Sequence, residues 1–338
     1  MHALIKYKRE INRTHKGLGN LYSFSLLGTK AKKCVITIGT AGSGKSVAMK
    51  AATAANVNGM IVRDSMTRSG LEKLQKDLNS FRGTFLVEDL GNIDTGYSLL
   101  ESIKTAVALA YDHKLSKLNA KLDLEISDFY GAFISSIQPE IMPMLINNTS
   151  WEAVIRDKTI RYYHILRATK PNRKPINVKV KWGLDITQIQ GMKRKSKQYL
   201  ELKRVFLDQH GLTRAEEHIE DFLKASAALD GRKQVTESDV KVCLELTRPM
   251  RLEKILVYKQ GVASEKEFLV DHCYMLTEFA TYGICTYEQL ASNWFVTVKS
   301  VKRILHNVAE MWTVRPKDDS NVYMKAVAKD ALKESGYL

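Results

Sequence analysis

The chain has 338 residues, of which 44% are hydrophobic, and its formal net charge is +15. This length allows two or three domains, and the composition is that of an ordinary globular protein. No apolar run reaches the roughly 18 residues that a membrane span needs, and the charged N-terminus lacks the apolar core of a signal peptide. We therefore expect a cytoplasmic protein without a membrane partner. Four scattered cysteines with no C-x-x-C spacing argue against disulfides and a zinc site.

The positive charge is concentrated in one part of the chain. Between Arg156 and Arg204, 15 Lys or Arg residues stand against 3 Asp or Glu. A local basic segment is typical of a protein that binds a polyanion, most often nucleic acid. The alternatives are a basic surface that contacts only solvent and a boundary between subunits.

The first motif in chain order is a phosphate loop, which follows a short lead-in of about 30 residues. Residues 35–38 predict a buried strand and residues 46–55 a helix. Between them the sequence fits G-x-x-x-x-G-K-[ST] without a mismatch. The predicted nucleotide-binding residues are Gly39, Thr40, Ala41, Gly42, Ser43, Gly44, Lys45, Ser46 and Val47.

Each part of this loop has a physical role. The glycines let backbone N–H groups turn toward phosphate oxygens, Lys45 reaches the β and γ phosphates, and the Ser46 hydroxyl ligates Mg²⁺. The helix that follows adds the positive end of its dipole. We therefore expect ATP and Mg²⁺ as cofactors; a glycine-rich turn that binds nothing is the alternative.

Two further strands are predicted to end in polar residues. Residues 83–94 read as a buried strand that runs into Glu88 and Asp89, one of which would help hold Mg²⁺ while the other acts as general base. Residues 128–140 read as a strand ending in Gln138, whose amide suits the orientation of an attacking water. The order of the two acids does not decide which is the base, and a strand-end pair without a catalytic role is the alternative.

The strands alternate with helices, which predicts a parallel sheet covered on both faces in residues 31–195. Residues 59–64 and 176–186 are expected to be further strands, and residues 69–81 and 98–115 helices. The segment around Arg156, Lys158 and Arg161 is read as helix and turn, and its cations are candidates for stabilising the phosphoryl transition state.

The remaining sequence is mainly helical. Residues 196–258 predict a helical lid that includes Arg214, and residues 265–338 predict three helices followed by two strands and a last helix, a winged helix-turn-helix. In its third helix, an apolar stripe opposes a basic face, as a DNA recognition helix requires. The predicted DNA-binding residues on this face are Lys299, Lys302 and Arg303; a winged helix used for protein contacts is the alternative.

In the order of these motifs, the chain resembles the AAA+ ATPases. The lid sequence "LTRAEEHIEDFLKASAALDGRKQVTESDVKVCLEL" is similar to that of the minichromosome-maintenance (MCM) helicases and their MoxR-type relatives. The resemblance implies that Gln138 is the first sensor, that Arg214 is the second, and that an arginine finger lies near Lys158 and Arg161. It also implies a DNA-gripping hairpin over residues 113–126 and a homo-oligomer, of which a hexameric ring is the usual form. The candidate DNA-contacting residues of the hairpin are Lys114, Lys117 and Lys121.

The chain also departs from this family. The acid order is reversed, the finger segment reads "RDKTIRYY" in place of Ser-Arg-Phe, and only about 30 residues precede the core, where the family has a DNA-binding domain. Three functions stay open. The first is an ATP-driven DNA motor, an MCM-like helicase or translocase in the replication of a small replicon. The second is a DNA-bound ATP switch, as in initiators, loaders or transposition regulators. The third is a MoxR-like protein remodeller.

Overall fold

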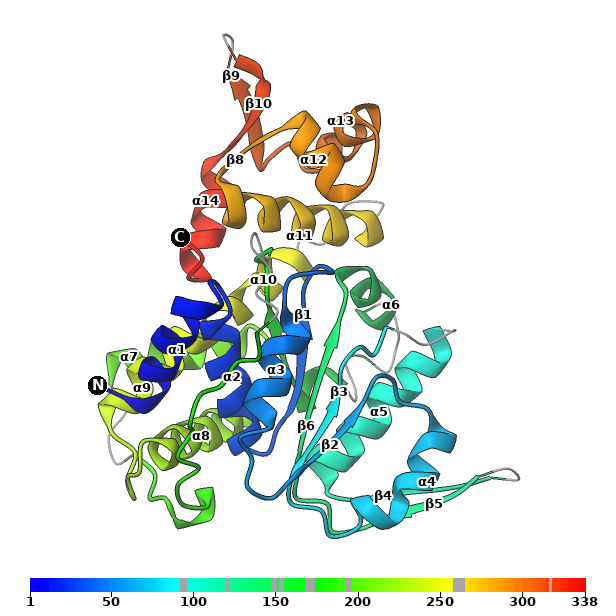
Figure 1. Ribbon diagram of the computed structural model, residues 1–338, viewed down its shortest axis with the longest axis vertical. Coiled ribbons are helices and arrows are strands. Elements are labelled where there is room, and N and C mark those ends of the chain that lie inside the picture. The colour runs from blue at the N-terminus through cyan, green and yellow to red at the C-terminus, as the bar shows by residue number, and fades with distance from the viewer. Residues whose placement is uncertain are drawn as a thin grey trace.

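The computed structural model describes residues 1–91, 96–119, 122–146, 151, 155–167, 174–192, 196–257, 265–315 and 318–338. Its centre is a five-stranded parallel sheet with the strand order β2-β3-β6-β1-β7 (Figure 1). The strands are β1 (Cys34–Ile38), β2 (Met60–Arg63), β3 (Thr84–Val87), β6 (Ala132–Ile137) and β7 (Thr159–Tyr163). Four of the five are buried along their whole length, which explains their continuous apolar sequences.

Helices cover both faces of the sheet, as predicted for an α/β fold. Alternate residues of β3 face opposite sides of the sheet. Leu86 packs with a first pair of helices on one face, whereas Phe85 and Val87 pack with a second pair on the other face. The first pair is α2 (Gly19–Lys30) and α3 (Lys45–Thr53); the second is α4 (Arg68–Leu78) and α5 (Gly96–Asp112). Short helical turns lie at the sheet ends: η1 (Pro139–Ile141), α6 (Met142–Ile146), η3 (Arg156–Lys158) and η4 (Ile186–Gln188).

The first 30 residues are more than a lead-in, which corrects the expectation from the sequence. They form α1 (Ala3–Thr14) and α2, and nearly every residue of α2 is buried between the sheet, α3 and the helical layer. Small and polar side chains in α2 concealed this from a pattern analysis, because a helix buried on all sides has no amphipathic period.

Two sheet assignments were also wrong. The fifth strand is β7, which the sequence analysis read as helix and turn. Residues 176–186 form no strand of the sheet but an extended segment, followed by η4, on the surface beside α1 and α2. The reason is chemical: a strand within a parallel sheet needs two apolar faces, and "INVKVKW" offers only one.

A helical layer (residues 196–257) packs against α1 and α2. It consists of α7 (Lys197–Leu207), α8 (Leu212–Leu229), α9 (Glu237–Thr247), η5 (Arg248–Arg251) and α10 (Leu252–Val257). A capping box formed by Thr236 and Asp239 starts α9.

The predicted hairpin is present as well. Strands β4 (Leu115–Asn119) and β5 (Leu122–Ile126) pair antiparallel, and they project from the end of the sheet at which the parallel strands begin (Figure 1). We call that end the amino edge and the opposite end the carboxyl edge.

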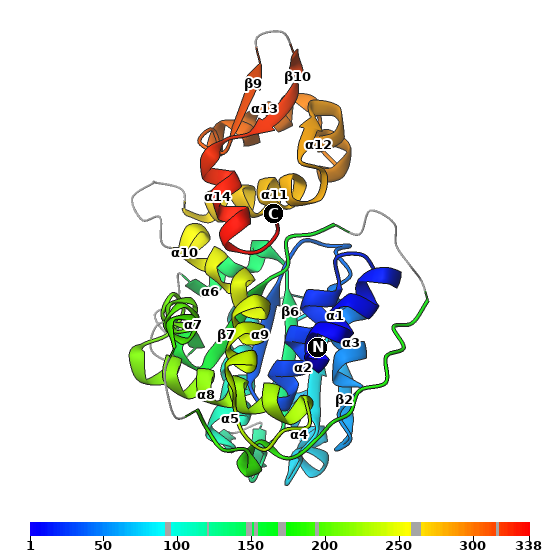
Figure 2. The ribbon, with the colours of Figure 1, turned by 90° about the vertical axis from the view of Figure 1, so that its left-hand side faces the viewer.

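The C-terminal unit (residues 265–338) stands on the carboxyl edge, as two perpendicular views show (Figures 1 and 2). It contains α11 (Glu265–Tyr282), β8 (Ile284–Thr286), α12 (Tyr287–Trp294), α13 (Val298–Asn307), β9 (Trp312–Arg315), β10 (Asp318–Met324) and α14 (Ala326–Glu334). Its small sheet has the order β8-β10-β9, one strand more than predicted. Across the described parts of the chain, no helix is both long and apolar enough to span a bilayer.

Candidate nucleotide-binding site

The phosphate loop joins β1 to α3 at the carboxyl edge. Gly42 and Gly44 have φ angles of +69° and +82°, which favour glycine. Gly39 is needed for a different reason: a Cβ at this position would lie 2.3 Å from the carbonyl oxygen of His164. The strand, loop and helix predicted from the motif are therefore all present, and the N-terminus of α3 opens onto the loop.

Lys45 is buried at the start of α3. Its ammonium group donates to the carbonyl oxygens of Gly39 at 2.6 Å and Thr40 at 2.9 Å. Burial lowers the pKa of Lys45 to about 8, although the nearby carboxylates of Asp89 and Glu140 oppose that shift. A desolvated cation held by only two carbonyl groups is well suited to attract a phosphate anion.

The segments that leave three strands are held together just beyond the sheet. The backbone N–H of Gly39 donates to Ile137, and that of Leu90 donates to Ser136, at 3.3 and 2.9 Å. Because β6 lies between β1 and β3, Gln138 comes between the phosphate loop and the acidic pair. The structure thus brings together the loop, Glu88, Asp89 and Gln138, as the sequence predicted.

The two acids point to different sides of the sheet edge. Glu88 accepts a hydrogen bond from Lys50 of α3 at 2.7 Å, which places it on the same side as Ser46, one helical turn before Lys50. Asp89 accepts from the backbone N–H of Gly91 at 2.8 Å and is the acid with the largest electrostatic effect on Lys45. Glu88 therefore lies on the side of Ser46, and Asp89 lies nearer Lys45; if the loop held Mg²⁺ and a nucleotide, Ser46 and Glu88 would be placed for the metal.

A nucleotide phosphate and its metal fit the residues present. The hydroxyl of Thr40, in the loop, is buried without a hydrogen-bond partner among the described residues. Buried polar atoms of this kind normally have a partner, so the loop retains hydrogen-bonding capacity for a ligand. Mg²⁺ typically takes only one or two protein ligands beside water and phosphate, as Ser46 and Glu88 would supply.

His164, at the end of β7, was missed by the sequence analysis. Its backbone N–H donates to Ile38 at 2.7 Å, and its Nε2 lies 3.0 Å from the carbonyl oxygen of Ser43 in the loop. Burial lowers the pKa of His164 to about 4, and the charge of Lys45 adds to this effect. The imidazole is therefore neutral at pH 7 and, with Nε2 as the donor, it holds the phosphate loop in place.

Arg161 does not have the predicted role. It lies in the middle of β7 with a fully buried side chain, and its guanidinium donates to Glu253 at 2.7 Å. Further bonds run to the carbonyl oxygens of Thr159 and Gln209, at 2.7 and 3.0 Å. A buried and neutralised guanidinium cannot reach a neighbouring subunit, so the expectation of an arginine finger at Arg161 is wrong.

Arg214 is also displaced from the site. Its guanidinium pairs with Glu217 at 2.9 Å and lies over the Tyr111 ring, 4.5 Å from its centroid. Tyr111 is at the end of α5, and Glu217 lies near Lys33, which precedes β1. These contacts place Arg214 at the amino edge. The five residues of β1 separate the two edges by about 16 Å, more than an arginine side chain spans, so Arg214 does not reach the phosphate loop of its own chain; a sensor role toward a neighbouring subunit stays a prediction.

Lys158 lies at the same amino edge, where it pairs with Asp112 at 2.8 Å. The predicted DNA-contacting lysines fall on two other surfaces. Lys114 is exposed at the base of the hairpin, Lys117 belongs to β4, and Lys121 lies outside the described residues. Lys299, Lys302 and Arg303 are all exposed on α13, opposite the buried Val301 and Leu305.

The C-terminal unit contacts the candidate site directly. Tyr274 of α11 donates to Glu140, and the Tyr337 hydroxyl donates to the carbonyl oxygen of Tyr163 at the end of β7. Glu140 follows Gln138 by two residues, so α11 reaches the segment that closes one side of the phosphate loop.

A second contact runs through Glu278 of α11, which is fully buried. It accepts from Arg167, just after β7, at 2.6 Å. The same carboxylate accepts from Asn293 at 2.8 Å and from the Trp294 indole at 3.1 Å. The Glu278 carboxylate thus links the segment after β7, next to the phosphate loop, with the end of α12.

Comparison of the sequence with protein-family models and with curated proteins gave no match. The site's chemistry therefore has to be inferred from its own residues: a phosphate loop with a buried lysine, two carboxylates and an amide at one sheet edge, and a second unit that contacts the same edge.

Proposed function

We propose that the protein is a Mg²⁺-dependent ATPase whose nucleotide site controls DNA binding by the C-terminal unit. The observation on which this rests is the phosphate loop, with Lys45 buried among carboxylates at the carboxyl edge and α11 in contact with that edge. A resemblance to the AAA+ class remains part of the proposal.

The nucleotide part follows from the loop. Bound Mg²⁺ and ATP would supply a phosphoanhydride and a metal that neutralises charge on its oxygens. Lys45 would hold the phosphates, and Ser46 and Glu88 the metal. Asp89 is placed to accept the proton of an attacking water, and Gln138 to orient that water.

The DNA part rests on the shape and charge of the C-terminal unit. Three helices and a small antiparallel sheet have the arrangement of a winged helix-turn-helix, in which α13 takes the position of the recognition helix. Its exposed cations suit phosphate and base-edge contacts. Thr297 caps the start of α13, so the helix begins where such a recognition helix must.

A switch is the better supported of the two DNA functions. The contacts from Tyr274 to Glu140 and from Glu278 to Arg167 link α11 to segments beside the loop. A change at the loop on nucleotide binding would therefore reach the unit that presents α13.

A DNA motor is the second candidate, and the projecting hairpin favours it. Lys114, at the base of the hairpin, would face DNA if β4 and β5 lined the channel of a homo-oligomeric ring, such as a hexamer. Against this, Arg161 is buried, and Arg214 lies at the amino edge, away from the phosphate loop of its own chain.

The test combines ATP binding with DNA binding. Full-length protein would be titrated with random and genomic-fragment duplexes, single strands and forks, each with no nucleotide, ATP or a non-hydrolysable ATP analogue. We expect ATP-dependent binding to duplex without strand separation, and loss of the ATP effect in Lys45→Ala. Strand separation with strongly stimulated hydrolysis would establish the motor instead.

A matched pair of variants tests the DNA part. Lys299→Gln/Lys302→Gln should weaken duplex binding, whereas Lys329→Gln/Lys333→Gln, on the exposed side of α14 in the same unit, should not. Equal binding by both variants and the wild type would remove α13 from the DNA interface. Wild-type protein that binds ATP but no DNA would leave only the nucleotide part of the proposal.

A further inference from the structure

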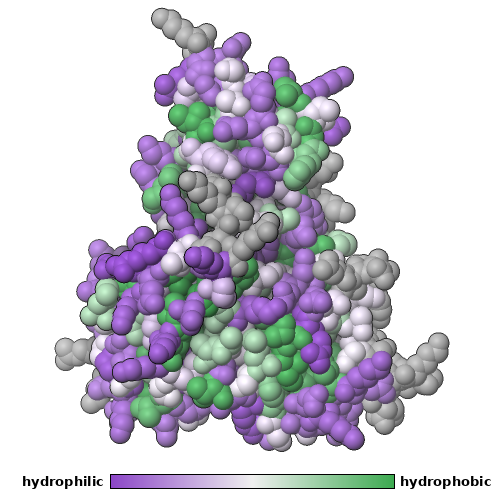
Figure 3. Space-filling view, viewed as in Figure 1, coloured by the Kyte–Doolittle hydropathy of each residue, from purple (hydrophilic) through white to green (hydrophobic). Residues whose placement is uncertain are grey.

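A row of cations runs along the exposed side of α1. Lys6, Arg9 and Arg13 follow one another at intervals of three and four residues, which places them on one stripe of the helix. Lys16 lies two residues after the helix ends and extends the row. All four are exposed, whereas Leu4, Tyr7 and Ile11 on the opposite side are buried. Figure 3 shows a hydrophilic surface over this helix.

The extended segment 174–182 lies beside α1 and adds to this row. Its residues alternate: Val178 and Val180 are half-buried against α1 and α2, while Lys179 and Lys181 are exposed. Two hydrogen bonds fix the segment antiparallel to α1. The Lys181 N–H donates to the Tyr7 hydroxyl at 3.2 Å, and the His15 Nε2 lies 2.8 Å from the carbonyl oxygen of Lys174.

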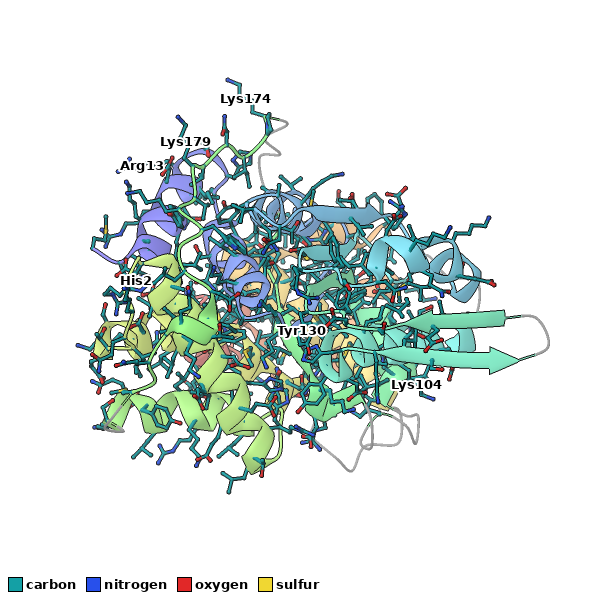
Figure 4. All side chains as sticks on the ribbon, turned by 90° about the horizontal axis from the view of Figure 1, so that it is seen from below. His2, Arg13, Lys104, Tyr130, Lys174 and Lys179 are labelled. Atoms are coloured by element: carbon teal, nitrogen blue, oxygen red, sulfur yellow. The ribbon has the colours of Figure 1, made fainter. Side chains whose placement is uncertain are left out.

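The side chains of these two elements gather on one rim of the molecule. Seen from below, Arg13, Lys174 and Lys179 lie together there and point outward (Figure 4). Within the parts of the chain that the structure describes, no ion pair involves Arg13, Lys179 or Lys181. Lys6, Arg9 and Lys16 likewise have no such pair, and Glu10 is the one acid in residues 1–16.

We propose that this surface, the α1 cation row with Lys174, Lys179 and Lys181, binds the sugar–phosphate backbone of nucleic acid. The inference rests on the DNA part of the proposed function and adds a second contact surface to it. The twelve residues of α1 span about 18 Å, the length of about five base pairs at 3.4 Å each. Several phosphates of one strand therefore lie within reach of the row.

The chemistry favours contacts without sequence preference. Lys and Arg side chains bind phosphate oxygens and fix the position of a protein on nucleic acid, but they do not by themselves read base sequence at the backbone. No aromatic ring is exposed in residues 2–16 or 174–182, so this surface has none of the stacking platforms typical of single-strand binders.

A subunit boundary fits this surface less well. The centres of protein interfaces are depleted of lysine and enriched in apolar and aromatic residues. None of the large apolar side chains exposed in the described chain comes from residues 2–16 or 174–182. The excess of cations over acids in these two segments would also make two copies of this surface repel each other.

The test is the salt dependence of binding to a 30-base-pair random duplex and to a 30-nucleotide oligo-dT, followed by fluorescence anisotropy. In Arg13→Gln/Lys179→Gln/Lys181→Gln, we expect at least a tenfold loss of affinity for the duplex near 0.1 M salt. The slope of log K against log salt should fall by about 1 for each cation that contacts a phosphate. The loss should be the same for different duplex sequences.

The matched control is Lys197→Gln/Arg204→Gln. Both residues are exposed on α7, which lies on the opposite side of the helical layer from α1 in Figure 2. We expect wild-type slopes from this variant. A fall in both variants in proportion to the charges removed, two in the control and three in the triple variant, would reduce the effect to net charge and overturn the inference. Unchanged binding by the triple variant, or a change only in oligomeric state, would also overturn it while leaving DNA binding by α13 intact. Wild-type protein that binds neither probe would refute the proposed DNA function itself.

Discussion

Replacing Arg161 with methionine distinguishes a structural arginine from a catalytic one. In the structure, the Arg161 side chain is fully buried, pairs with Glu253 at 2.7 Å and lies over the Trp151 ring, 5.1 Å from its centroid. Methionine keeps much of the side-chain volume but removes the charge and every hydrogen bond of the guanidinium group. We therefore expect the variant to lose stability, with no specific effect on a neighbouring subunit.

The size of the stability loss follows from the unpaired charge that the substitution leaves on Glu253. After the substitution, Glu253 is a buried carboxylate whose other side-chain partner is the Tyr163 hydroxyl, at 3.3 Å. Breaking a buried ion pair on one side costs about 3–5 kcal/mol, which corresponds to a fall in Tm on the order of 10 °C for a unit of this size. Removing the second charge as well, in Arg161→Met/Glu253→Leu, should restore about 2–3 kcal/mol, because no uncompensated charge is then left.

Thermal unfolding followed by circular dichroism measures both effects, and Arg204→Met provides the control at an exposed arginine. Mixing experiments complete the assay: wild-type protein mixed with Arg161→Met should lose ATPase activity in proportion to the dilution. Two results together would refute a purely structural role for Arg161. The variant would melt like the wild type, and it would lower the ATPase activity of the mixture more than dilution alone does.

Three further predictions concern the candidate site. Because the pKa of Lys45 is lowered to about 8, its ammonium loses its proton as the pH rises through that value; the Kd for ATP should therefore rise between pH 7 and pH 9, but not in Lys45→Arg, which stays charged. Asp89→Asn should keep ATP binding and lose turnover by about 100-fold or more, while Glu88→Gln should need more Mg²⁺ for half-maximal activity; exchanged phenotypes would exchange the roles of the two acids. Glu278→Gln removes the buried charge that pairs with Arg167, so anisotropy should show DNA binding that depends less on ATP, and an unchanged ATP effect would contradict the coupling.

Local patterns predicted much of the fold. The phosphate loop and the acidic strand were placed correctly, because each depends on residues close together in the sequence; the hairpin was expected from the family resemblance alone, and it is present. The outer strand β7 was harder to predict. The strand β7 has the sequence "TIRYY", and a charged residue in its middle hides a strand that is buried on both sides.

The partner of that charge explains the error. Glu253 lies 92 residues after Arg161, and nothing in the local pattern indicates that the two meet. An isolated arginine next to apolar residues is therefore as compatible with catalysis as with a buried ion pair. The same applies to Arg214, whose place depends on how the helical layer packs against Tyr111 and Lys33.

The candidate site shows the same division between local and distant contacts. Sequence alone identified the residues of the loop and the strand ends, but it missed His164 and Glu140. His164 contacts Ser43 from 121 residues away, and its only local signal is its position after β7, a strand that had not been recognised. Glu140 follows Gln138 closely, but its role depends on Lys45 and Tyr274, which come from other elements.

The placement of α11 gives the proposed switch a physical basis. The polar contacts between the C-terminal unit and the sheet described above involve residues that directly follow or end a strand next to the phosphate loop: Glu140 after β6, and Tyr163 and Arg167 at and after β7. Packed elements of this kind move as units and do not deform continuously. A displacement of the loop that carries His164 or Glu140 with it would therefore be passed to α11 as a tilt, and through Glu278 and Trp294 to the start of α13. The buried carboxylate of Glu278 lies between β7, next to the phosphate loop, and α12, the helix that precedes α13, which is the position that the proposed coupling requires.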